Sequence, residues 1–437
     1  MAYYSIFPEI DTTLYSHPDR TAMNTGGDEI LELVKERGTT NTRHYPSRIL
    51  IKFKNEEIKS TISDTIGSSK FNDGTTEVAL QLLSTEPKSL TQILNIETFL
   101  VSQSWHEGSG RYSNLPTSSN GATWAYRDNS TTETAWGGMS TLAGIGYSSI
   151  GIGFIVGGYT SQANLNTSTG VSFSSIGNTF IIGAYTASGL SPFSPGTTGS
   201  INTNIGIEAG GGVWYTGSCF TATQQFLNNE NLDINLDVTC LVQKHSASLF
   251  ANSAYPTGVP NNGFIIKHPK SVEENTSSSF GEMQYFSVDT HTIYPPKLTF
   301  KWDDSVHNYQ STSKKSGSLN VTLYKNKQEF NQNDEALLRI HVRDKYPTRQ
   351  FASSSNYLNP GYFTTASYYS IRDAHTEEEV IPFDTSYTKL SSDSEGMYFK
   401  IFMKGLQPER YYRILFKHKN NEGTKIYDNK YHFKVVR

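Results

Sequence analysis

Cysteine and charge are both scarce in this sequence of 437 residues. The two cysteines, Cys219 and Cys240, cannot form the disulfide framework of a small secreted scaffold, so we expect reduced thiols in a protein assembled inside the cell. Charged residues make up only 18%, and the formal net charge of -4 argues against a strongly basic nucleic-acid-binding protein. The amino terminus lacks the features of a signal peptide, and no uncharged apolar run reaches the roughly 18 residues of a spanning helix.

Aromatic residues are abundant instead, with 26 Tyr, 23 Phe and 5 Trp. Aromatic and β-branched side chains suit the half-buried surface of a β-sheet, and here short runs of them are separated by turns rich in Gly, Pro and Asn. Predicted strands cover residues 49–53, 77–83, 233–242, 263–267, 284–288, 297–302, 319–324, 335–343, 398–403, 411–417 and 431–436. The periodicity of 28–37 and 93–105 fits helix or strand. The sequence therefore predicts an all-β fold.

Composition divides the chain near residue 317. Residues 305–317 are polar and predict a linker. The following segment, 318–437, holds 18 Lys and Arg against 14 Asp and Glu, whereas residues 1–317 are net acidic. Its length and its roughly seven predicted strands are typical of an immunoglobulin-like β-sandwich. We therefore expect one domain at 1–304 and an immunoglobulin-like domain at 318–437.

Residues 137–217 differ from the rest, because they contain 19 of the 35 glycines and a single charged residue, Glu208. Residues 148–160 recur as 174–186 with nine of 13 positions identical, which predicts one β-unit used twice. A free surface is normally charged, whereas the cores of protein interfaces lose charge and gain aromatic residues. We expect this block to pack against a second copy or a neighbouring protein; the alternative is a self-contained extra β-layer. The predicted interface residues are Phe154, Ile155, Val156, Tyr159, Phe180, Ile181, Ile182 and Tyr185.

The first 304 residues resemble the DNRLRE family, whose members are found in surface and adhesion proteins. The matching segments are DTTLYS at 11–16, NTGG at 24–27, EILEL at 29–33, RILIKF at 48–53, SWHEG at 104–108, ATWAYR at 122–127, AWG at 135–137, LDVTCLV at 236–242, NNGFIIK at 261–267 and YPPKL at 294–298. The resemblance implies a jelly-roll β-sandwich and makes 29–36 a strand. Residues 139–213 depart from the family pattern and constitute a Gly-rich β insertion.

The whole chain also resembles virion structural proteins of T-even-like myoviruses that infect marine cyanobacteria. The segments that carry this likeness are YSIFPE at 4–9, DTHTIYPP at 289–296, VIPFDTSYTKLS at 380–391 and GLQPERYY at 405–412. The resemblance implies a component of the tail, baseplate or neck, assembled in the host cytoplasm into the virion.

No pattern in the sequence indicates a catalytic or metal site. The 11 histidines are scattered, and the cysteines lack the close partners of a zinc site. Asp303 and Asp304, with His291 and His307, form the best local cluster, but adjacent carboxylates on a strand point to opposite faces. Glycoside cleavage by carboxylates that meet only in three dimensions stays an open alternative. We expect no enzyme, no cofactor and no metal.

The function predicted from these patterns is a non-enzymatic virion component that connects or decorates other virion proteins, as a homo-oligomer within the particle and without nucleic acid or a membrane span. The alternative is a receptor- or glycan-binding adhesin of the phage tail. In that case Trp105, Trp124 and Trp136 would be the glycan contacts, although tryptophans in such motifs more often fill a sandwich core.

Overall fold

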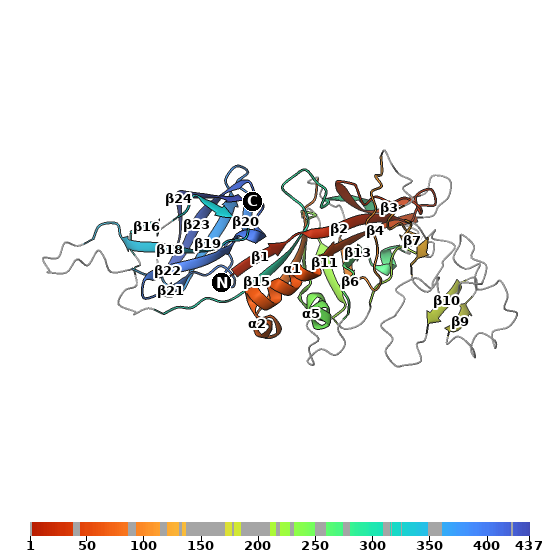
Figure 1. Ribbon diagram of the computed structural model, residues 1–437, viewed down its shortest axis with the longest axis horizontal. Helices are drawn as coiled ribbons and strands as arrows, with labels where there is room; N and C mark the ends of the chain where they lie inside the picture. The colour runs from red at the N-terminus through yellow and green to blue at the C-terminus, as the bar shows by residue number, and fades with distance from the viewer. Residues whose placement is uncertain are drawn as a thin grey trace. The chain divides into compact units, whose positions relative to one another are not determined.

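The computed structural model shows a protein built mainly from β-strands, which confirms the all-β prediction (Figure 1). It describes residues 2–37, 44–85, 93–113, 120–130, 133–136, 171–176, 179–184, 210–215, 219–227, 231–249, 259–273, 280–308, 315, 317–324, 326–347, 361–420 and 423–437.

The chain forms two compact units. Unit 1 comprises Met1–Ile6, Ser63–Val78 and Thr299–Arg437, and unit 2 comprises Phe7–Ile62 and Ala79–Leu298. The chain passes between the units four times: between Ile6 and Phe7, between Ile62 and Ser63, and within the strands β5 (Glu77–Leu82) and β15 (Lys297–Trp302). Unit 1 thus joins the carboxy-terminal segment to two segments from before residue 79, and the domain limits expected from composition stay a prediction.

Unit 2 is organised around a seven-stranded sheet. Its strand order is β11 (Thr221–Phe226), β6 (Leu94–Leu100), β13 (Phe264–Lys267), β4 (His44–Phe53), β3 (Ile30–Arg37) and β14 (Phe280–Phe286), and β2 (Pro8–Tyr15) also pairs with β4. The two ambiguous segments are therefore the strands β3 and β6. A strand surrounded on both faces has no side that can stay polar, and nine of the ten residues of β4 are buried.

The residues after β12 (Ile234–Asp237) correct one prediction. The expected strand 233–242 ends at Asp237, and α5 (Thr239–Leu249) follows. Asp237 Oδ1 accepts hydrogen bonds from the backbone N–H and the hydroxyl of Thr239, as a side chain that starts a helix does. Val238, Leu241 and Val242 are buried at helical spacing. The strand period therefore changes to a helical period inside a single apolar run.

Unit 1 contains two sheets that share one core. The first has the order β16 (Leu319–Tyr324), β18 (Glu335–Asp344), β22 (Gly396–Phe402) and β21 (Ser391–Asp393). The second has the order β17 (Glu329–Asn331), β24 (Gly423–Val436), β23 (Arg410–Asn420), β19 (Ser367–Asp373) and β20 (Glu379–Ile381). Phe399 of the first sheet stacks on Tyr369 of the second with ring centroids 4.7 Å apart. Strand β1 (Ala2–Ile6) lies beside β15 and contributes Tyr3 to the same core.

The remaining elements are short. They are α1 (Asn55–Ser60), the π-helix η1 (Thr61–Ile66), α2 (Ser68–Asn72), β7 (Tyr126–Asp128), β8 (Thr134–Ala135), β9 (Val171–Ile176), β10 (Thr179–Ala184), α6 (Lys270–Glu273) and the 3-10 helix η4 (Met403–Gly405). Strands β9 and β10 pair antiparallel, so residues 174–176 and 179–184 of the second repeat copy lie in two paired strands.

The two cysteines correct a second prediction, because Cys219 and Cys240 form a disulfide. Their Cα atoms are 5.2 Å apart, within the range for a bridge. Cys219 precedes β11, and Cys240 lies in the first turn of α5. The expectation of reduced thiols rested on cysteine number alone, which carries no information about which segments the fold brings together.

Candidate functional site

A buried ion pair lies at the centre of unit 2. Arg48 of β4 meets Glu273 of α6, and each side chain is 1% exposed. Arg48 Nε donates to Glu273 Oε1 at 3.0 Å, and Nη2 donates to Oε2 at 2.8 Å. This bidentate geometry satisfies the carboxylate at two points, which a buried charge requires.

A second cation and a second carboxylate, Lys267 and Glu97, adjoin this pair. Lys267 of β13 lies with its Nζ 3.4 Å from Glu273 Oε2 and 3.7 Å from Glu97 Oε2. Burial alone would raise the pKa of Glu273, but the charges of Arg48 and Lys267 oppose it, and the net direction is downward. Burial lowers the pKa of the neighbouring His268 to about 4, so its imidazole is neutral at neutral pH. Glu273 therefore stays ionised, and its carboxylate pairs with both Arg48 and Lys267.

Tryptophan rings enclose these charges. The Arg48 guanidinium carbon lies 4.6 Å from the centroid of Trp124 and 5.3 Å from that of Trp214. Trp214 also lies 5.6 Å from Lys267 Nζ. A cation over the face of an indole ring is attracted electrostatically by the ring, and the attraction is stronger where water is excluded.

The three tryptophans singled out from the sequence are all in this core. Trp105, Trp124 and Trp136 are 7%, 0% and 1% exposed. Trp105 Nε1 donates to the Asn262 carbonyl at 2.8 Å, and Trp136 Nε1 donates to the Thr123 carbonyl at 2.9 Å. Rings placed in this way have no open face for a sugar, so the core interpretation fits them and a glycan platform does not.

The same core holds the downstream end of the Gly-rich insertion. Arg48 Nη1 donates to the carbonyl of Gly211 at 2.8 Å, and the Gly211 N–H donates to the carbonyl of Trp124 at 2.7 Å. A Cβ on Gly211 would lie 2.6 Å from both Arg48 Nη1 and Trp124 Cη2, and its φ of 71° disfavours any side chain. Close approach to the buried guanidinium therefore requires glycine here.

The upstream end is held by the same rings. Trp136, immediately before the insertion, packs in one apolar cluster with Trp124, Val213 and Trp214. Its backbone N–H donates to the carbonyl of Ala125 at 3.5 Å. We call the group formed by Arg48, Lys267, Glu273, Trp124, Trp136 and Trp214 the insertion anchor. The described residues on either side of the nearly uncharged block, Trp136 and Gly210–Trp214, are both in contact with this anchor.

The burial of Glu273 between two cations favours a structural role for the insertion anchor over general acid–base catalysis. Its carboxylate has a lowered pKa and is enclosed by two cations, whereas a general acid or base needs a pKa near the working pH and access to substrate. What the arrangement can do is present the residues between Trp136 and Gly210 from a rigid base.

The predicted interface residues fall mostly outside the described residues. Phe154, Ile155, Val156, Tyr159 and Tyr185 lie outside them, and of Phe180, Ile181 and Ile182 only the backbone of β10 is described. Their contact with another protein stays a prediction.

The local cluster of acids and histidines is divided between the two units, and within unit 1 the charge of Asp303 acts on His307. His291 of unit 2 lies 3.6 Å from Glu29, whereas Asp303 Oδ1 of unit 1 accepts hydrogen bonds from the backbone and hydroxyl of Ser305. In the part of the chain that the structure describes, no group of three His, Cys, Asp or Glu side chains is arranged to hold a metal ion.

Sequence reasoning missed the three charged members of the anchor. Arg48 and Glu273 are 225 positions apart, so no local pattern joins them. One signal was available: Arg48 and Lys267 each adjoin continuous apolar runs, and a charge in such a run must be paired. The triplet Gly210–Gly211–Gly212 was a second signal, because consecutive glycines permit the positive φ that all three residues adopt in the structure.

Comparisons with protein-family models, curated proteins and solved structures found no match for this chain. Among the described residues, none of the helices combines the length and the apolar character that crossing a bilayer demands.

Proposed function

We propose that the chain is a non-enzymatic structural component of a tailed-phage virion, in the tail, baseplate or neck. It connects or decorates other virion proteins by burying its nearly uncharged insertion against them. The observation that supports this proposal is the insertion anchor, because it fixes both ends of a block that has one charge in 81 positions.

The anchor matters because binding has an ordering cost. A segment that must be immobilised on contact loses conformational freedom, and this loss is subtracted from the energy of the contact. Fixing both ends in a close-packed core lowers that cost before the partner arrives. Burial of apolar surface then contributes roughly 25 cal/mol per Å².

In this proposal unit 2 is an elaborated jelly roll and unit 1 carries an immunoglobulin-like sandwich. Unit 1 offers a further contact surface on the outer face of its first sheet. Tyr324 of β16 is 56% exposed, and Leu337 of β18 is 47% exposed. Both lie on the same face as Arg339, which pairs in register with Tyr324. Tyrosine and arginine are the residues that interfaces favour.

The test is incorporation into particles. The full chain with a small tag is produced in an infected culture and sought in purified virions, next to a variant in which residues 139–209 are replaced by a short Gly–Ser linker. We expect the full chain in the particles and the shortened chain in the unbound fraction.

Two controls make this test specific. Circular dichroism and urea unfolding of the shortened chain establish that its sheets still form. A Tyr324→Ser/Leu337→Ser variant keeps the insertion and reports on unit 1 separately. Equal incorporation of the shortened chain would refute a role for the insertion, and absence of the full chain from particles would refute the virion assignment.

A further inference from the structure

The Cys219–Cys240 disulfide joins parts of unit 2 that belong to different layers. Cys219 precedes β11, the edge strand of the seven-stranded sheet, and Cys240 lies in α5, the helix that follows β12 of the four-stranded sheet. Both cysteines are partly exposed, as a disulfide that exchanges with dissolved thiols must be. The bond therefore links β11 to α5 at a place that small molecules reach.

Cys240 occupies a position that stabilises a thiolate. It is the second residue of α5, where the N–H groups of the first turn have no partner within the helix and the helix dipole favours negative charge. Lys244 lies one turn further along the same face, and its Nζ is 5.4 Å from the ring centroid of Phe220, the residue after Cys219. When the disulfide opens, Cys240 is thus the sulfur that carries negative charge more easily.

One carboxylate at this end of α5 acts in the opposite direction. Asp237 accepts hydrogen bonds from the N–H and the hydroxyl of Thr239, so it already uses part of the positive end of the helix. Asp237 is exposed, whereas Lys244 is only partly exposed. Water and salt screen an exposed charge more strongly, so the effect of the lysine and the helix dipole outweighs that of the carboxylate.

The backbone at Cys219 favours opening of the bond. Its φ is 64°, a conformation that residues with a side chain rarely adopt and that persists only where the surroundings enforce it. The rings of Tyr215 and Phe220 lie 5.5 Å apart, and the Tyr215 N–H donates to the carbonyl of Leu100 at 2.9 Å. The chain is therefore held on both sides of Cys219, and reduction removes one of the constraints that keep this residue in an unfavourable conformation.

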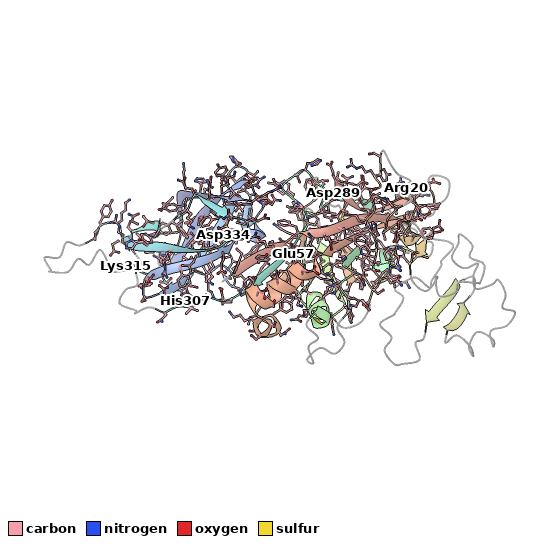
Figure 2. The ribbon with its side chains drawn as sticks, in the orientation of Figure 1. Arg20, Glu57, Asp289, His307, Lys315 and Asp334 are labelled. Atoms are coloured by element: carbon pink, nitrogen blue, oxygen red, sulfur yellow. A yellow bond between two sulfur atoms is a disulfide. The ribbon has the colours of Figure 1, made fainter. Side chains whose placement is uncertain are left out.

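The surrounding fold has supports other than the disulfide. Every residue of β11 pairs with β6, and β12 pairs with β5. Gln224 joins the two strands, because its Nε2 donates to the carbonyl of Asp233 and its Oε1 accepts the N–H of Asn235. The helix α1, on which Glu57 is labelled in Figure 2, also contacts α5. Opening of the bond is therefore a local event.

From this geometry we infer that Cys219–Cys240 is a thiol–disulfide exchange site that takes small thiols and dithiols as substrates and locks α5 to β11 only when oxidised. A thiolate attacks Cys219 Sγ, the S–S bond breaks, and its electron pair leaves with Cys240. A second thiol attacks the resulting mixed disulfide and frees Cys219. Two electrons pass from the thiols to the chain, the thiols become one disulfide, and their protons pass to the cysteines or to water.

This inference goes beyond the proposed virion role and does not depend on it. Glutathione and thioredoxin-like dithiols keep exposed cysteines reduced inside cells. The chain would therefore fold with two free thiols in a reducing compartment and close the lock where oxidised thiols are present. The reverse of the reaction above, with a disulfide as the oxidant, forms the bond.

The test follows reduction of the native full chain by reduced glutathione. Samples are quenched with acid over time, and mass spectrometry of the digested chain identifies free, bridged and glutathione-bound cysteines. We expect the rate to rise in proportion to the glutathione concentration, the mixed disulfide to form on Cys219, and the circular dichroism to stay unchanged. A rate independent of glutathione would show that the bond opens only after unfolding and would overturn the inference, as would a mixed disulfide mainly on Cys240.

A variant tests the role of the lysine. Lys244→Gln removes the cation from α5 and should slow reduction about threefold, because Cys240 becomes a poorer leaving group. Lys54→Gln and Glu56→Gln change exposed charges at the start of α1, one of each sign, and should react at the native rate. An unchanged rate in Lys244→Gln would contradict the assignment of Cys240 as the leaving sulfur.

A second readout is independent of the leaving step. In the chain with Cys219→Ser, the ultraviolet absorbance of the thiolate reports ionisation of Cys240, which should occur at lower pH than in a free cysteine. Ionisation at the same pH as in free cysteine would remove the physical basis of the exchange site. None of these measurements involves particle incorporation, so the exchange site and the virion role fail separately.

Discussion

Two arginine–carboxylate pairs, one in each unit, have nearly the same geometry and opposite surroundings. Arg48 and Glu273 in unit 2 are each 1% exposed, whereas Arg339 and Asp393 in unit 1 are 25% and 34% exposed. Both pairs are bidentate, with N to O distances of 2.8 to 3.0 Å. Each arginine also lies near an aromatic ring, Trp124 at 4.6 Å and Tyr398 at 5.5 Å.

The comparison teaches that burial, more than contact geometry, decides what such a pair does. In water the attraction is screened, and an exposed pair contributes about 0 to 1 kcal/mol. In the interior each partner depends on the other, because a lone buried charge costs several kcal/mol. The Arg48–Glu273 pair therefore fixes the positions of Gly211 and the tryptophans. The Arg339–Asp393 pair lies on the surface of a sheet and contributes little to stability.

The largest expected effect is the loss of Arg48. Arg48→Met leaves Glu273 with a single buried cation, and we expect the free energy of unfolding to fall by about 3 to 5 kcal/mol. Urea unfolding followed by tryptophan fluorescence measures it, since four of the five tryptophans belong to unit 2. Arg48→Met/Glu273→Leu should regain part of the loss. If the free energy of unfolding of Arg48→Met fell by less than about 1 kcal/mol, the buried pair would contribute no more than the exposed pair, and burial would not be what distinguishes them.

Removal of the Cys219–Cys240 disulfide should cause the second largest loss of stability. Closing the loop between Cys219 and Cys240 restricts the unfolded chain, and for a separation of 21 residues the expected contribution is about 3 kcal/mol. Cys219→Ser/Cys240→Ser should lower the melting temperature, and dithiothreitol should lower it similarly in the native chain. Free thiols found in the unreduced chain by Ellman's reagent would contradict this prediction.

A buried carboxyl group without a cation should show the opposite pH dependence to Glu273. Asp11 accepts hydrogen bonds from Ser287 Oγ and the Val288 N–H, and burial raises its pKa from 3.8 to about 8. The folded state thus keeps a proton that the unfolded state releases. This stability is fully present below about pH 4 and declines by about 1.4 kcal/mol per pH unit as the pH rises toward 8.

Asp11→Asn should remove this slope from urea unfolding measured between about pH 5 and pH 8. A shallower slope should remain up to about pH 7, because burial raises the pKa of Glu107, which accepts the Asp11 N–H, to about 7. Glu56→Gln serves as the control and should keep the native profile. An unchanged slope in Asp11→Asn would show that Asp11 is not the group that titrates.

The smallest effect belongs to the outer pair. A double-mutant cycle with Arg339→Ala and Asp393→Ala should give a coupling energy of at most about 1 kcal/mol, and added salt should reduce it. Urea unfolding followed by circular dichroism measures the cycle. A coupling of several kcal/mol would place the outer pair in the same class as the inner one.

Strand positions were the most predictable part of the fold. The predicted strands 297–302 and 319–324 coincide with β15 and β16, because a period of two along a half-buried sheet is a local property. Helix α5 was missed because its apolar residues continue the run begun by β12. Of the site, Trp124 and Trp136 were singled out, but with a sugar-binding role as the alternative to the core role that fits their burial.

By itself the sequence determined where many of the strands lie, that the fold is all-β, and that one long block carries almost no charge. Only the tertiary structure decided that Arg48 lies against Glu273 and Lys267, that Cys219 meets Cys240, and that Tyr15 packs against Tyr112. The physical reason is range. Backbone preferences and periodicity act over a few residues, whereas the pairing of buried charges depends on segments as far apart as 225 positions.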